Sequence, residues 1–122
     1  MDNLLDLLQQ ATITLTQSGA IKDRLAEAYA AHLIQIDADD LPEHLRGDFT
    51  ALCDAMRRER PLPRESAIRA SVRKMSNEEA LRHAAAVVKL FAGVARANTG
   101  AAARRVRNPA SAPIVSLFAA DG

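Results

Sequence analysis

Three histidines and one cysteine are the side chains in this sequence that could bind a metal ion or act as a nucleophile. They are His32, His44, His83 and Cys53. A zinc site needs ligands that are close in the sequence or brought together by the fold, and none of these four lies within one helical turn of another. No segment resembles a nucleophile elbow or a glycine-rich phosphate-binding loop. We therefore predict no catalytic residue, no metal site, no cofactor and no enzymatic activity.

An acidic segment, Asp37 with Asp39 and Asp40, supplies the oxygen ligands that hard cations prefer. The segment lacks the glycine and the distant glutamate of a calcium-binding loop. Helix capping is the better interpretation, because Asp40 precedes Pro42 and lies three residues before Glu43, which resembles a capping box.

Basic residues cluster between positions 57 and 74. We name this the basic segment. Its candidate nucleic-acid-binding residues are Arg57, Arg58, Arg64, Arg69, Arg73 and Lys74. Arg60 lies in the same segment. Arginine binds phosphate oxygens through two parallel hydrogen bonds, and Arg69 and Arg73 lie one helical turn apart. Nucleic-acid binding is therefore one functional hypothesis.

The charge distribution leaves a second interpretation of the basic segment open. Residues 1–55 carry three basic and ten acidic side chains, whereas residues 56–122 carry thirteen and five, so the two parts have charges of −7 and +8. A basic part attracts acidic partners. Acidic and basic helices packed side by side in one bundle would neutralise each other instead.

The sharpest feature is an apolar peptide, residues 114–118, that follows a segment rich in Ala, Arg and Pro. Burying a large apolar side chain contributes about 1.5 to 3 kcal/mol, so such a peptide gains by docking. We expect Val115, Leu117 and Phe118 to be the anchors in a hydrophobic groove. The groove belongs to this domain or a sister subunit, or to another protein.

The sequence Ile114-Val115-Ser116-Leu117-Phe118 resembles the short peptide by which many bacterial replication and repair proteins bind the sliding clamp, usually written Gln-Leu-Ser/Asp-Leu-Phe. Ser116, Leu117 and Phe118 match this motif, and Val115 replaces its leucine. Ile114 stands where the motif has its glutamine. The resemblance covers five of 122 residues and implies the sliding clamp as a candidate partner.

Apolar residues recur at helical spacing along most of the chain, which predicts an all-α fold, a bundle of four or five helices. The first helix should run over residues 2–17, although the β-branched stretch at 12–16 would also suit an extended segment. The second covers residues 21–36, and the third begins after Asp40 and ends before the prolines at 61 and 63. The fourth covers residues 65–75, and a fifth follows a capping box at Ser76.

The fifth helix is the most apolar and should bury a broad face against two or more neighbours. The residues of this face are Leu81, Ala84, Val87, Val88, Phe91 and Val94. From Asn98 the continuous apolar face is lost. We therefore predict a helical bundle over residues 1–97, a flexible linker over 98–113 and an apolar tail peptide over 114–122.

Composition supports a helical cytoplasmic protein. Hydrophobic residues make up 48% but aromatic residues only 3%, and Gly and Pro number five each, so aliphatic side chains and Ala must fill the core. The longest apolar run is too short to cross a membrane, and no secretory signal is visible. Arg outnumbers Lys by 13 to 3, a bias common in GC-rich bacterial genomes.

We therefore predict a non-catalytic interaction or adaptor protein of bacterial type, with a protein partner and the capacity to self-associate. The alternative hypothesis is a nucleic-acid-binding or regulatory protein that uses the basic segment. An enzyme whose site forms only in the folded chain is the third.

Overall fold

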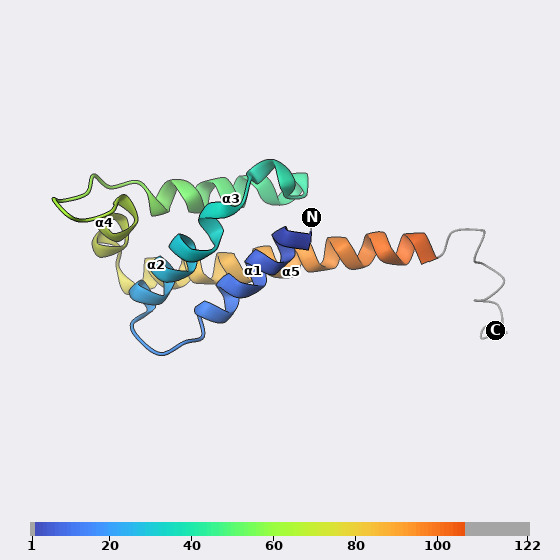
Figure 1. Cartoon of the computed structure of the whole chain (residues 1–122), viewed down its shortest axis with the longest axis horizontal. Helices are drawn as coiled ribbons and strands as arrows, with labels where there is room; N and C mark the ends of the chain where they lie inside the picture. Colours follow the sequence, from blue (N-terminus) through green and yellow to red (C-terminus); the bar gives the residue numbers. More distant parts are fainter. Residues whose placement is uncertain (1, 107–122) are drawn as a thin grey trace.

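A computed structural model describes the backbone of residues 2–106 and the side chains of residues 3–99. Its α-helices are α1 (Asp2–Thr14), α2 (Ile21–Ala31), α3 (Glu43–Met56), α4 (Ala67–Lys74) and α5 (Asn77–Val106), and two 3-10 helices, Leu33–Gln35 and Ala38–Asp40, link α2 to α3. Residues 2–106 contain no strand. The predicted all-α bundle is confirmed, with five α-helices that surround one core (Figure 1).

The first helix stays helical through most of its β-branched stretch, so the extended alternative is wrong. The hydroxyl groups of Thr12 and Thr14 donate hydrogen bonds to the carbonyls one turn earlier, at 2.9 Å and 3.0 Å. The chain then turns at Gly19, whose φ of 112° favours glycine. Arg24 of α2 donates hydrogen bonds to the carbonyls of Leu15 and Gly19, which joins the end of α1 to α2.

The third helix begins later than predicted, and its expected cap is wrong. Pro42 is the N-cap residue and no side chain caps the helix, while Asp40 belongs to the preceding 3-10 turn. In that turn the carboxylate of Asp37 accepts a hydrogen bond from the backbone N–H of Asp39 at 3.0 Å. Capping therefore explains one acidic residue of the segment, at a different helix from the one expected.

Serine hydroxyl groups set the starts of the last two helices. Ser66 accepts a hydrogen bond from the backbone N–H of Arg69, and Ser76 accepts one from Glu79, both at 3.0 Å. The predicted cap at Ser76 is confirmed. Between α3 and α4 the chain reverses at Arg64, which adopts a left-handed conformation with φ of 67°.

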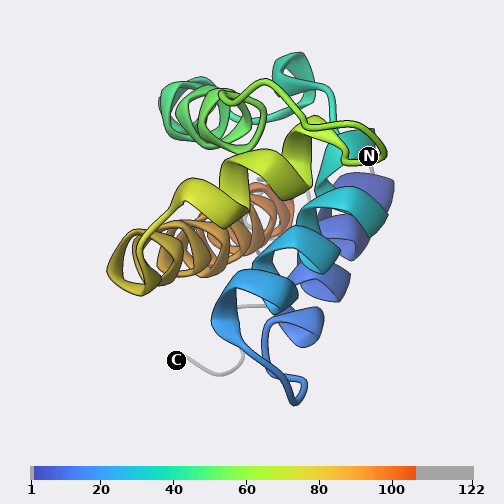
Figure 2. The same cartoon turned by 90° about the vertical axis from the view of Figure 1, so that its left-hand side faces the viewer.

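The core lies where α1, α2 and α3 meet α5. Its largest fully buried side chains include Tyr29, Leu8, Leu25, Leu33 and Leu90. Of the broad face predicted for α5, Ala84, Val87 and Val94 are buried and Phe91 is half-buried, but Leu81 and Val88 are exposed. Figure 2 shows why: the other helices gather around one side of α5 and leave its opposite side open.

The fifth helix extends beyond the bundle. The range predicted as a linker, 98–113, begins as helix, because α5 continues to Val106, and residues 107–113 lie outside the described residues. Three consecutive alanines, the best helix formers, follow Gly100, and the hydroxyl group of Thr99 bonds to the carbonyl of Ala95 at 2.9 Å. The last turns of α5 therefore project past the other helices (Figure 1). No helix of residues 2–106 combines the length and the hydrophobicity that a bilayer crossing requires.

Candidate interaction surfaces

The basic segment starts at the carboxyl end of α3, crosses the loop to α4 and ends on α4. Two of its arginines, both on α4, form ion pairs with carboxylates of neighbouring segments. Arg69 pairs with Asp23 of α2 at 3.1 Å. Arg73 pairs with Glu65 through two hydrogen bonds, at 2.8 Å and 3.0 Å. The predicted pairing between the acidic and basic parts of the chain is therefore realised at Arg69.

Glu65 is the most strongly perturbed carboxyl group in the described chain. The guanidinium of Arg73, followed by the backbone N–H of Leu62, lowers the pKa of Glu65 to about 2. The same carboxylate raises the pKa of Arg73. This pair fixes the loop onto α4, because Glu65 precedes the helix and Arg73 lies in its last turn.

The remaining basic residues differ in how well they are neutralised. Arg58 reaches Glu79 of α5 at 3.5 Å, and the same carboxylate lies 3.6 Å from Nε2 of His83. Arg57, Arg64 and Lys74 are exposed and form no ion pair with the described residues. Among the described residues, the six predicted cations thus divide into three that form ion pairs and three that do not.

The cysteine, on α3, and the single tyrosine, on α2, lie together between these two helices. Cys53 is half-buried, and Tyr29 is 1% exposed. Burial, and then the hydrogen bond with Cys53, raises the pKa of Tyr29 to about 12. Burial also raises the pKa of the Cys53 thiol, so the reactive thiolate form is disfavoured.

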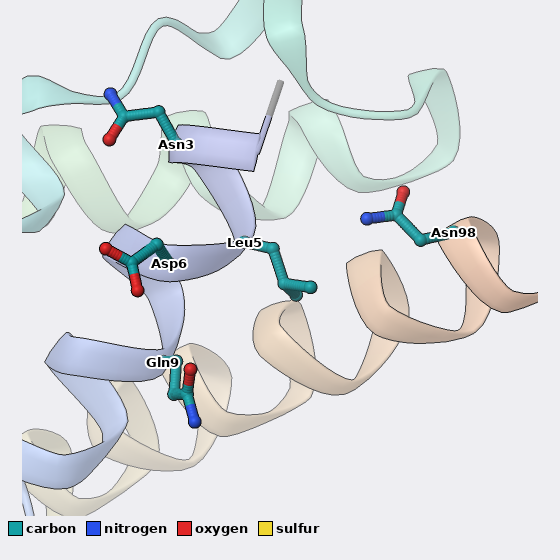
Figure 3. Close-up of a pocket in the computed structure, with 5 residues that line it drawn as sticks. All are labelled: Asn3, Leu5, Asp6, Gln9 and Asn98. Carbon is teal, nitrogen blue, oxygen red and sulfur yellow. The ribbon is translucent and has the colours of Figure 1, made fainter.

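A groove of about 550 Å³ opens between the start of α1 and the later part of α5 (Figure 3). Its lining residues are Asn3, Leu5, Asp6, Gln9 and Asn98. Three of these are amides, which offer both hydrogen-bond donors and acceptors, so the groove suits a polar surface of a partner. This groove was not predicted from the sequence, although Asn3, Asp6 and Gln9 recur every three residues on one helix.

The open side of α5 carries the apolar residues that the core does not use. Leu81 is 54% exposed and Val88 is 45% exposed, with Ala85 between them on the same face. From the sequence, Leu81 and Val88 were expected to lie in the core with the other apolar residues of this helix. The apolar face of α5 is wider than the part of it that the core covers. This excess width was the sequence signal for a second contact surface.

The other residues singled out from the sequence form no site among the described residues. No group of three His, Cys, Asp or Glu side chains in the part of the chain described here could hold a metal ion. The tail anchors Val115, Leu117 and Phe118 lie outside the described residues.

No known protein family, curated protein or solved structure matches this chain. Its function must therefore be argued from its own surfaces.

Proposed function

We propose that this protein is a non-catalytic adaptor of bacterial type, in which a helical bundle carries a C-terminal docking peptide with Val115, Leu117 and Phe118 as anchors. Its proposed partner is another protein, which receives Leu117 and Phe118 in an apolar groove. The resemblance of residues 114–118 to the clamp-binding motif makes the bacterial sliding clamp the first partner to test.

The observation that carries this proposal is the projection of α5. Asn98 of α5 shares a groove with α1, and the helix continues for eight more residues, to Val106. At 1.5 Å per residue these eight residues extend about 12 Å past the bundle. The chain that follows Val106 therefore starts away from the bundle surface, which favours contact with a separate protein.

Binding to purified sliding clamp, measured by calorimetry, tests the proposal directly. The full chain should bind with a micromolar dissociation constant, and the double variant Leu117→Ala/Phe118→Ala should lose most of this affinity, about 2 to 4 kcal/mol for two hot-spot side chains. Ser111→Ala lies outside the motif and serves as the matched control. Equal affinities of all three chains would refute a role for the anchors.

A pull-down separates clamp binding from docking on another protein. A chain that ends at Val106 keeps all of α5, so it removes the tail without cutting the helix, unlike a truncation at Asn98. Full-length and shortened chains that capture the same partners, and have the same oligomeric state, would contradict the adaptor proposal.

Nucleic-acid binding is the second candidate function, and the free cations of the basic segment favour it. Arg57 and Arg64 are exposed beside the loop between α3 and α4, next to Arg60. Binding to a labelled DNA or RNA duplex should weaken steeply as salt rises from about 50 to 200 mM, because bound counterions are released. Arg57→Ala/Arg64→Ala should reduce the salt dependence, whereas no binding at low salt would dismiss this candidate.

A further inference from the structure

A second groove lies between α3 and α5, away from the groove beside α1. It has a volume of about 250 Å³, and its lining residues are Leu45, Asp48, Arg82, Ala86, Lys89 and Leu90. The three aliphatic residues are buried or half-buried, whereas the three charged residues are exposed, so the groove has an apolar floor and a charged rim. Pockets for whole small molecules have volumes of about 300 to 1,000 Å³, so this groove suits a few side chains of a peptide instead.

The rim of this groove carries an excess of positive charge. Arg82 and Lys89 lie about two turns apart on α5, and neither forms an ion pair with a described residue. Asp48 is the one acid among the lining residues. An apolar floor beside two cations favours a peptide that presents an aliphatic side chain together with a carboxylate.

The tail peptide, residues 114–122, carries both of these groups. Leu117 is aliphatic, and Asp121 follows it by four residues. The β-branched residues Ile114 and Val115 favour an extended backbone. Alternate side chains of an extended peptide share one face, so Leu117 and Asp121 can enter the groove together.

The tail peptide is long enough to reach the groove of its own chain. Leu90 lies sixteen residues before Val106 on α5, which is about 24 Å at 1.5 Å per residue. The eleven residues from Val106 to Leu117 span up to about 36 Å. The projection of α5 past the bundle is therefore compatible with a return of the tail peptide to α5.

The spacings along the two segments agree. Arg82 lies eight residues before Leu90, about 12 Å along α5. Asp121 lies four residues after Leu117, about 13 Å along an extended peptide. A peptide that returns from Val106 runs antiparallel to α5, so it meets Leu90 before Arg82. This is the order in which Leu117 precedes Asp121.

We propose that the tail peptide docks in this groove of its own chain, antiparallel to α5, with Leu117 against Leu90 and Asp121 beside Arg82. The proposed function uses Leu117 as an anchor for the partner protein. A docked tail peptide therefore competes with that partner, which lowers the partner's apparent affinity. This regulatory consequence rests on the proposed function, whereas the docking itself does not.

Two neighbouring alanines of α5 provide a matched test of the docked position. The proposed register places Ala119 level with Ala86, which lines the groove, whereas Ala85 is exposed on the open side of α5. In a Cys53→Ala background, Ala86→Cys/Ala119→Cys should form an intrachain disulfide about tenfold faster than Ala85→Cys/Ala119→Cys, because burial of Leu117 holds the peptide in the groove. Mass spectrometry of dilute chains under mild oxidation measures both rates. Equal rates, or a faster reaction at the more exposed Ala85 position, would overturn the docking.

Further substitutions test the two contacts. In the Ala86→Cys/Ala119→Cys chain, Leu117→Ala should slow disulfide formation about tenfold. Arg82→Glu should slow it about two- to fivefold, because exposed ion pairs contribute little. Arg57→Glu is the matched control for charge, because Arg57 is exposed at the carboxyl end of α3, away from the groove, and it should leave the rate unchanged. Circular dichroism should show all of these chains folded. A rate that neither Leu117→Ala nor Arg82→Glu changes would overturn the proposed contacts.

Binding to purified sliding clamp tests the competition separately. Arg82→Glu should bind the clamp about two- to fivefold more tightly than the wild-type chain, because it releases the tail peptide, and Arg57→Glu should bind as the wild type does. Equal affinities of Arg82→Glu and the wild type would overturn the competition. A chain that forms the groove disulfide but binds no clamp would support the docking and dismiss the clamp as the partner, so the two proposals fail independently.

Discussion

Gly93 of α5 faces the side chain of Leu45 of α3, and a substitution at Gly93 tests how closely the two helices pack. A Cβ atom at Gly93 would lie 2.9 Å from Cδ1 of Leu45 and 3.1 Å from its Cδ2. Replacing glycine by alanine inside a helix contributes about 1 kcal/mol of helix propensity. Overpacking against a neighbour costs about 1 to 3 kcal/mol. The atoms met here are the far end of the half-buried Leu45 side chain, which can turn aside at the lower end of that cost, so we expect Gly93→Ala to leave the free energy of unfolding about unchanged.

Gly47 of α3 supplies the matched control, because a Cβ atom there would meet no atom within 4 Å. Gly47→Ala should therefore raise the free energy of unfolding by about 1 kcal/mol. In a Leu45→Ala background the clash at Gly93 disappears, and Gly93→Ala should then stabilise the protein by the same amount. The coupling between positions 45 and 93 is thus about 1 kcal/mol.

Urea unfolding followed by circular dichroism measures all of these values. Equal stabilisation by Gly93→Ala and Gly47→Ala in the otherwise native chain would refute the close approach of α3 and α5 at Leu45.

Three further predictions concern Glu65, Tyr29 and Ser71. The pKa of Glu65 is lowered to about 2, so its pair with Arg73 stabilises the fold fully above the ordinary carboxyl pKa of 4.5. This stabilisation is lost as the pH falls towards 2. Glu65→Gln should therefore lower the melting temperature at pH 6 but not at pH 2. Tyr29, the only tyrosine in a chain without tryptophan, should ionise near pH 12 when absorbance is followed at alkaline pH, unless unfolding comes first and exposes it near pH 10. Ser71 is 3% exposed and its hydroxyl accepts the backbone N–H of Glu59 at 3.0 Å, so Ser71→Ala should cost about 1 to 3 kcal/mol in urea unfolding, and a smaller loss would mean that water satisfies this group.

Helical periodicity was sufficient to predict the fold class and the number of helices, because each stretch carries a consistent apolar face. It was less reliable at helix ends. Asp40 looks like a cap, but the chain forms a 3-10 turn there first and α3 begins after Pro42. The end of α5 was placed too early because loss of the apolar face was taken as loss of the helix, whereas alanine sustains a helix without a face to bury.

The candidate surfaces were harder to predict, because they depend on which helix covers which face. Leu81 and Val88 are adjacent to Ala80 and Val87 in the sequence, and only the positions of α1 and α3 show that the latter two are buried and the former two are not. Likewise, the charge pattern of the basic segment does not show that Arg69 meets Asp23, 46 residues earlier. These partners are distant in sequence and no local pattern reports them.

The packing of α1 against α5 constrains how the protein is made. Leu8 and Leu90 belong to the same core, yet the ribosome adds about 5 to 20 residues per second, so Leu90 follows Leu8 by about 4 to 16 seconds. Throughout that interval α1 and α2 have emerged without the helix that covers their apolar faces. The bundle therefore completes its core only when α5 is synthesised, and the nascent helices are the stage at which this chain is most exposed to chaperones and to aggregation.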